Sequence, residues 1–190
     1  MCVVSTALFL SIHYDMTDWK TEYWRNGASI EHCAIPAALR SWLLERGSLT
    51  RKLRAHCAGR VSVRVTAHAW GRITRAERQA LDMDLRVRGF VRQVELSCAD
   101  RVVIFARTVL PPATVAARRH LTRLGNRALG DVLFADRRVQ RGAVRVARLP
   151  QGIPVTWPTG TIEGPLWGRR SLFMSGAAPL LVSEYFLSVP

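Results

Sequence analysis

The chain has 190 residues, of which 48% are hydrophobic, so it can form one domain with a core and is not a disordered tail. Its formal net charge is +14, which directs attention to nucleic acid, anionic membranes or a small anionic substrate. The arginines are spread along the chain without one dominant block. We therefore interpret most of them as ordinary surface cations and expect no nucleic acid partner.

Residues 1–35 are interpreted as an N-terminal extension, and residues 36–190 as a single domain. Residues 2–12 are mostly apolar, but they lack the basic start and the cleavage site of a signal peptide and are too short to span a bilayer. No other stretch approaches transmembrane length. The four cysteines form no CxxC pair and no histidine cluster has zinc spacing, which predicts free thiols, no metal site and a cytoplasmic location.

Periodicity predicts the secondary structure in chain order. Helical spacing and capping patterns predict helices over residues 35–45, 49–57, 74–80, 111–125 and 128–134. Apolar alternation predicts strands over residues 61–68, 90–97, 102–110, 139–149, 166–174 and 180–187, with a loop over residues 151–164. Residues 102–110 are apolar on both faces, which is typical of a central strand. Strands in hairpins with helices inserted between them predict an α+β fold with an antiparallel sheet.

Two charged residues interrupt apolar strand faces. Arg92 alternates with Phe90, Val94 and Leu96, and Glu184 alternates with apolar neighbours in the last predicted strand. Because alternate side chains share a face and an unpaired buried charge is costly, both residues need partners. They could pair with each other, or they could hold a small polar ligand between them.

The adjacent arginines Arg169 and Arg170 should lie on opposite faces of one strand, and we expect one of them to be solvated. The stretch LGNRALG at residues 124–130 lacks the lysine followed by serine or threonine of a phosphate-binding loop. A helix end is the better local interpretation of this stretch.

Six segments carry a resemblance to a known family. LGNRALGDVLF (residues 124–134), FARTVLP (105–111), WGRRSLF (167–173), PLLVSEYFL (179–187), WLLERGSLTRKL (42–53) and VRQVELSCAD (91–100) resemble chorismate lyases in sequence, order and approximate spacing. The resemblance implies an antiparallel sheet with flanking helices that enclose a ligand cavity. It also implies a chorismate pyruvate-lyase, which eliminates pyruvate from chorismate and leaves 4-hydroxybenzoate for ubiquinone biosynthesis, without a cofactor.

The same resemblance assigns site residues. The family's binding arginine falls on Arg92 and its key glutamate on Glu184, both of which we expect to be catalytic and ligand-binding. A backbone contact falls on Leu129, and a ligand contact in the second helix falls on Leu49. The chain departs from the family pattern at Ala128, where proline is common, and in an extended segment over residues 140–164.

The expected chemistry is simple, because loss of pyruvate makes the ring aromatic. Arg92 would hold a substrate carboxylate, and Glu184 would either hydrogen-bond the ring hydroxyl or hand a proton to the departing enolpyruvyl group. We expect a monomer. Two alternatives remain, a non-catalytic effector-binding domain of the same fold and a basic nucleic-acid-binding protein.

Overall fold

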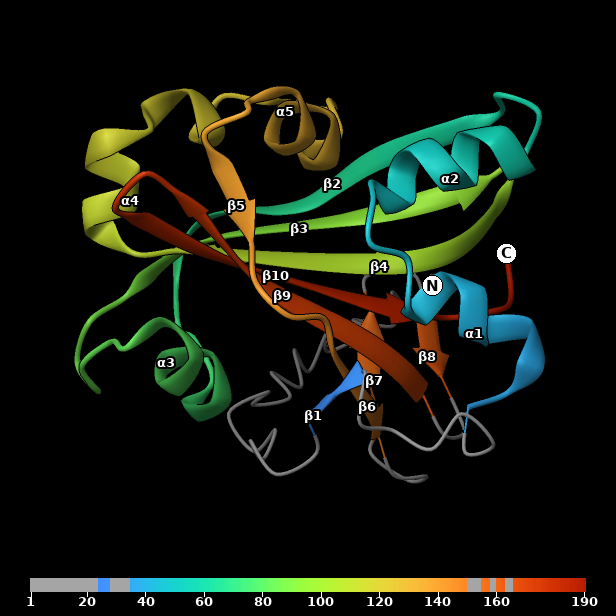
Figure 1. The fold of residues 1–190 in the computed structure, drawn as a ribbon, viewed down its shortest axis with the longest axis horizontal. Coiled ribbons are helices and arrows are strands. Elements are labelled where there is room, and N and C mark those ends of the chain that lie inside the picture. Colours follow the sequence, from blue (N-terminus) through green and yellow to red (C-terminus); the bar gives the residue numbers. More distant parts are fainter. Residues whose placement is uncertain (1–23, 28–34, 150–154, 158–159, 163–165) are drawn as a thin grey trace, which may run out of the picture.

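The fold is built on one antiparallel sheet, and the computed structural model describes residues 24–27, 35–149, 155–157, 160–162 and 166–190. In spatial order the strands are β1 (Arg25–Asn26), β6 (Arg145–Leu149), β9 (Leu166–Ser175), β10 (Ala178–Phe186), β4 (Arg101–Leu110), β3 (Gly89–Cys98) and β2 (Val61–Gly71). A further short strand, β5 (Val139–Arg141), pairs with one end of β9. The predicted α+β class with an antiparallel sheet is confirmed (Figure 1).

The strand β4 lies between β10 and β3, as its apolar pattern predicts. Every residue from 103 to 110 is buried, because β4 has a neighbouring strand on each side and packed side chains on each face. Two hairpins supply the neighbours, β3 with β4 and β9 with β10. β9 and β10 correspond to the predicted strands over residues 166–174 and 180–187, and a turn at residues 176–177 joins them.

Helices cover both faces of the sheet. On one face lie α1 (Ala37–Leu43), α2 (Leu49–His56), α4 (Pro112–Ala117) and α5 (Leu129–Ala135), which share two apolar clusters with the side chains of β3, β4 and β10. On the other face, α3 (Arg75–Leu81) packs Leu81 against Val91, Val109 and Leu181. Figure 1 shows α2 and α5 on the opposite side of the strands from α3. Among the described residues, none of the helices is long and apolar enough to cross a membrane.

Local signals explain where several helices begin. Ser48 caps α2 by accepting a hydrogen bond from the Arg51 amide at 3.2 Å. Thr74 and Glu77 form the predicted capping box of α3, in which each side chain satisfies a backbone N–H of the first turn. These short helices are then held by burial of their apolar faces against the sheet.

The predicted helix over residues 111–125 is wrong in its extent. α4 ends at Ala117, Arg118 leaves helical geometry with φ −135° and ψ 51°, and a 3₁₀ turn (Arg119–Thr122) follows. The break lets Leu121 and Leu124 pack on the sheet in one apolar cluster. Packing of these two leucines thus outweighs continuation of the helix.

Two further segments differ from the prediction. Residues 139–149 form two strands, β5 and β6, separated at residues 142–144, where the Gly142 amide donates to the Leu172 carbonyl. The predicted loop over residues 151–164 contains a small hairpin of β7 (Val155–Trp157) and β8 (Gly160–Ile162). The rest of that segment lies outside the described residues.

The prediction of four free thiols is wrong, because Cys57 and Cys98 form a disulfide with their Cα atoms 5.6 Å apart. Cys57 ends α2 and Cys98 ends β3, and the pairing of Val61 with Cys98 brings the two ends together. Cys2 and Cys33 lie outside the described residues.

Part of the expected N-terminal extension, residues 1–35, belongs to the sheet. Arg25 and Asn26 pair with Val146 and Arg145 of β6, and Trp24 is buried beside Tyr185. Residues 2–12, the apolar run of the sequence, lie outside the described residues.

Candidate functional site

A cavity lies between the sheet and the helices α2 and α5. Its volume is about 50 Å³, several times the roughly 10–15 Å³ that one water molecule requires on the same measure. Most of its lining is apolar, and the polar exceptions are Thr50, Thr108, Arg92, Arg141, Arg169 and Glu184. The four site residues expected from the sequence, Leu49, Arg92, Leu129 and Glu184, all line this one cavity.

Arg92 lines the cavity and is 3% exposed. Its Nη2 donates hydrogen bonds of 2.9 Å to the carbonyls of Gly125 and Arg127 in the turn before α5. No carboxylate of the described residues pairs with it, and burial alone lowers the pKa of its guanidinium. A desolvated cation without a counterion favours an anion beside it.

Glu184 is paired with Arg169 rather than with Arg92. The two residues lie opposite each other in β10 and β9, and Arg169 Nε is 2.6 Å from Glu184 Oε2. Arg169 Nη1 also donates to the carbonyls of Trp42 and Glu45, which anchors the guanidinium beside the carboxylate. Arg92 and Glu184 therefore do not pair with each other, which was one of the two possibilities that the sequence left open. Both residues line the same cavity.

The expectation that Arg169 or Arg170 is solvated is wrong. Arg169 is 1% and Arg170 4% exposed, because β9 is covered on both faces. Arg169 lies on the cavity face with Phe173, whereas Arg170 lies on the other face, with its guanidinium 4.5 Å from the centre of the Trp24 ring. The alternation of side chains is therefore as predicted, but both alternate positions are interior.

Sheet register sets the spacing of Arg92 and Glu184. Arg92 pairs with Thr108, Thr108 pairs with Val182, and Glu184 lies two residues farther along β10. The two residues are thus separated by two strand spacings of about 4.8 Å across the sheet and by two residues of about 3.3 Å along it. Their Cα atoms therefore lie roughly 12 Å apart on one face of the sheet. The two side chains thus come from one face of the sheet, and both line the cavity.

The helices α2 and α5 close the cavity opposite the sheet. Leu49 is the first residue of α2 and Leu129 the first of α5, so each has a backbone N–H without an intrahelical acceptor. Arg54 of α2 binds Asp131 of α5 at 2.8 Å. A Cβ at Gly130 would lie 3.1 Å from Ser48 Oγ, so the glycine permits the close approach of the two helices.

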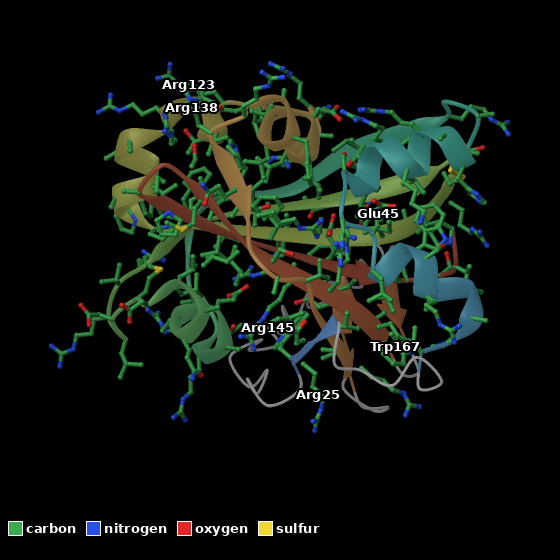
Figure 2. All side chains as sticks on the ribbon, in the orientation of Figure 1. Arg25, Glu45, Arg123, Arg138, Arg145 and Trp167 are labelled. Atoms are coloured by element: carbon green, nitrogen blue, oxygen red, sulfur yellow. A yellow bond between two sulfur atoms is a disulfide. The ribbon has the colours of Figure 1, made fainter. Side chains whose placement is uncertain are left out.

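Arg141 of β5 is a site residue that the sequence analysis missed. Its Nε donates to Ser171 Oγ at 3.0 Å, and its Nη1 donates to the carbonyls of Glu45, Arg46 and Gly47. Glu45 lies in the segment between α1 and α2 (Figure 2). The basic segment around Arg141 carries no pattern that distinguishes this arginine from its neighbours.

Two phenylalanines hold the Arg141 guanidinium in the cavity wall. Its Cζ lies 5.4 Å from the Phe173 ring centre and 5.9 Å from that of Phe134, which favours a cation over each ring. Burial, followed by the nearby charge of Arg169, lowers the pKa of Arg141 to about 10. The described residues contain no group of three or more histidine, cysteine, aspartate or glutamate side chains that could hold a metal ion.

Comparison with known proteins shows to which family the chain belongs. The family model described as chorismate lyase matches residues 20–190. The chain belongs to the chorismate lyase family. A probable chorismate pyruvate-lyase of Methylococcus capsulatus is 41% identical over 152 residues, which cover 78% of this chain and 94% of that protein. Another of Pseudomonas aeruginosa is 38% identical over 156 residues, which cover 81% of this chain and 85% of that protein.

One solved structure is similar in fold to this member of the chorismate lyase family. The crystal structure of a Staphylococcus aureus gene product superposes with a TM-score of 0.51 over 75% of this chain and 89% of that one, at 12% identity. At this identity the likeness concerns the fold alone. Within the family, this chain has Ala128 directly before the cavity-lining Leu129, and Ala128 has φ −68°, which a proline could also adopt.

Proposed function

We propose that the protein eliminates pyruvate from chorismate in this cavity and releases 4-hydroxybenzoate, which serves ubiquinone biosynthesis. Membership of the chorismate lyase family makes it an enzyme of the lyase class. The curated relatives at 38–41% identity are named probable chorismate pyruvate-lyases. These names support chorismate as the small-molecule substrate.

The observation that carries the proposal is the buried, unneutralised guanidinium of Arg92 in a largely apolar cavity that has Glu184 on the same sheet face. A benzoate carboxylate can receive a charge-assisted hydrogen bond from Arg92, while its para hydroxyl reaches Glu184. The apolar lining between the two ends suits a flat ring. Substrate and product share this carboxylate and hydroxyl, so we expect the product to be retained strongly.

The reaction balances without a co-reactant. The bond between the ring carbon and the enolpyruvyl oxygen breaks, the neighbouring ring carbon loses a proton, and the enolpyruvate gains a proton to become pyruvate. Glu184, ion-paired with Arg169, can take the proton that the ring carbon beside the broken bond loses and hand it to the methylene carbon of the departing enolpyruvate. Its other contact with the ligand is a hydrogen bond accepted from the ring hydroxyl. Aromatisation of the ring drives the step, and the protein supplies position and electrostatic stabilisation.

The proposed enzyme works as a monomer without metal or cofactor. The side chains that line the cavity supply the proposed binding and proton transfer by themselves. A net charge of +14 would also raise the encounter rate with a dianionic substrate.

The test is to incubate EDTA-treated, dialysed protein with chorismate and to quantify products by chromatography. We expect equal amounts of 4-hydroxybenzoate and pyruvate. If activity required added metal, or if no product formed, the proposal would be wrong. Binding of 4-hydroxybenzoate without turnover would favour the effector-binding alternative, and salt-dependent binding of DNA at physiological ionic strength would favour a nucleic-acid role.

A further inference from the structure

The charge of the cavity exceeds what the product alone can neutralise. Its lining contains three arginines and one glutamate, a net charge of +2. The product 4-hydroxybenzoate brings one carboxylate, whereas chorismate brings two, one on the ring and one on the enolpyruvyl group. A dianion therefore matches the cavity, and the second carboxylate requires a cation of its own.

Among the described residues Arg141 forms no ion pair with a carboxylate, although the charges of Glu184 and Glu45 act on it from a distance. Arg169 is neutralised by Glu184 at 2.6 Å, and Arg92 faces the ring carboxylate in the proposed function. The hydrogen-bond partners of Arg141 are the Ser171 hydroxyl and three backbone carbonyls, all of them neutral. Within the described part of the chain its Nη2 makes no hydrogen bond, although the residue lines the cavity, so this N–H₂ group can serve a ligand.

The setting of Arg141 suits recognition rather than a merely structural role. The two phenylalanine rings and the four acceptors hold its guanidinium in one place, so little conformational entropy remains to be lost on binding. It is close enough to Arg169 and Glu184 for their charges to act on it. A carboxylate beside Arg141 would thus lie near the proposed point of proton transfer.

We propose that Arg141 binds the enolpyruvyl carboxylate of the substrate, so that it distinguishes dianionic chorismate from the monoanionic product. This proposal rests on the proposed function. Arg92 holds the carboxylate that substrate and product share, and Arg141 holds the carboxylate that leaves with pyruvate. The Arg141 contact is lost to the product when the carbon–oxygen bond breaks, because pyruvate carries the second carboxylate away.

The experiment compares substrate and product in the same variant. In Arg141→Gln we expect the KM for chorismate to rise roughly tenfold or more, as for loss of a charge-assisted hydrogen bond. The affinity for 4-hydroxybenzoate, measured by calorimetry, should remain that of the wild type. Arg138→Gln is the matched control, because Arg138 lies three residues away, is exposed (Figure 2) and, among the described residues, forms its ion pair with Asp136.

The outcomes separate the two proposals. If the wild type forms no 4-hydroxybenzoate, the proposed function fails. If the wild type is active and Arg141→Gln keeps its KM, or loses substrate and product affinity equally, the assignment of Arg141 is overturned. Arg141→Lys keeps the charge without the planar fork and should recover part of the KM. If the glutamine variant does not fold, Arg141→Lys carries the comparison, with a smaller rise in KM and unchanged product affinity expected.

Discussion

Arg169 and Glu184 face each other across β9 and β10 and form an ion pair in the wall of the cavity, with 2.6 Å between Nε and Oε2. Because this pair neutralises Glu184 within the sheet, Arg92 is left without a carboxylate partner among the described residues. The cavity thus contains an ion-paired carboxylate and, two strands away, a cation that can bind an anion. This separation underlies the proposed roles of both residues.

We expect Glu184→Gln to fold and to bind 4-hydroxybenzoate, but to slow the single-turnover conversion of chorismate by roughly a hundredfold or more. Glutamine keeps the shape and can hydrogen-bond the ring hydroxyl, but it cannot accept a proton. Rapid-quench single-turnover rates are the measurement, because slow product release could hide the defect in steady state.

A matched control for Glu184→Gln exists on the other face of the sheet, where Glu77 forms a buried ion pair with Arg107 at 2.7 Å. Glu77→Gln also breaks a buried pair and should lower stability, yet the folded variant should turn over like the wild type. A wild-type single-turnover rate in Glu184→Gln would leave Glu184 as a binding residue only.

Arg92→Gln should weaken substrate and product alike, because both carry the ring carboxylate. Loss of the charge-assisted hydrogen bond should cost on the order of 1.5–3 kcal/mol of binding free energy. Calorimetric titration with 4-hydroxybenzoate measures it, with Arg123→Gln as control, because Arg123 is exposed (Figure 2). Equal affinities of the two variants would remove Arg92 from the site.

Ala128→Pro should raise the free energy of unfolding by about 0.4–1 kcal/mol. Ala128 has φ −68° and ψ 126° and directly precedes α5, a position where proline is tolerated because its φ is already adopted. Thermal unfolding is the measurement. Ala116→Pro, inside α4, is the contrasting variant and should destabilise by roughly 3 kcal/mol. A lower melting temperature for Ala128→Pro would show that the turn before α5 cannot accept the ring.

The double variant Cys57→Ser, Cys98→Ser should lose roughly 2–4 kcal/mol of stability, because the disulfide closes a loop of 41 residues. Neither cysteine lines the cavity, so turnover of the folded variant should be unchanged. Denaturation with and without reductant is the measurement, and only the wild type should respond to reductant. Thiol titration of the unreduced, unfolded protein that found Cys57 and Cys98 free would refute the bond.

Strand periodicity was enough to place Arg92 and Glu184 on apolar faces, because the alternation of side chains is a local property of the backbone. The central position of β4 and the α+β class also followed from local pattern. The end of the helix that begins at Pro112 could not be predicted from local pattern, because packing of Leu121 and Leu124 on the sheet ends α4 early.

Partner choice within the site was decided by the tertiary structure. Glu184 meets Arg169 because the turn between β9 and β10 sets their register, and a shift of one residue would exchange Arg169 for Arg170 at that position. Arg141 enters the cavity from a short strand that lacks a distinctive pattern, and Cys57 meets Cys98 because β2 returns beside β3. The sequence alone determined which side chains share a face, because that depends on neighbours along the chain. Which charges neutralise each other, and which arginines of the cavity lack a carboxylate partner among the described residues, depended on contacts between segments that lie far apart in the chain.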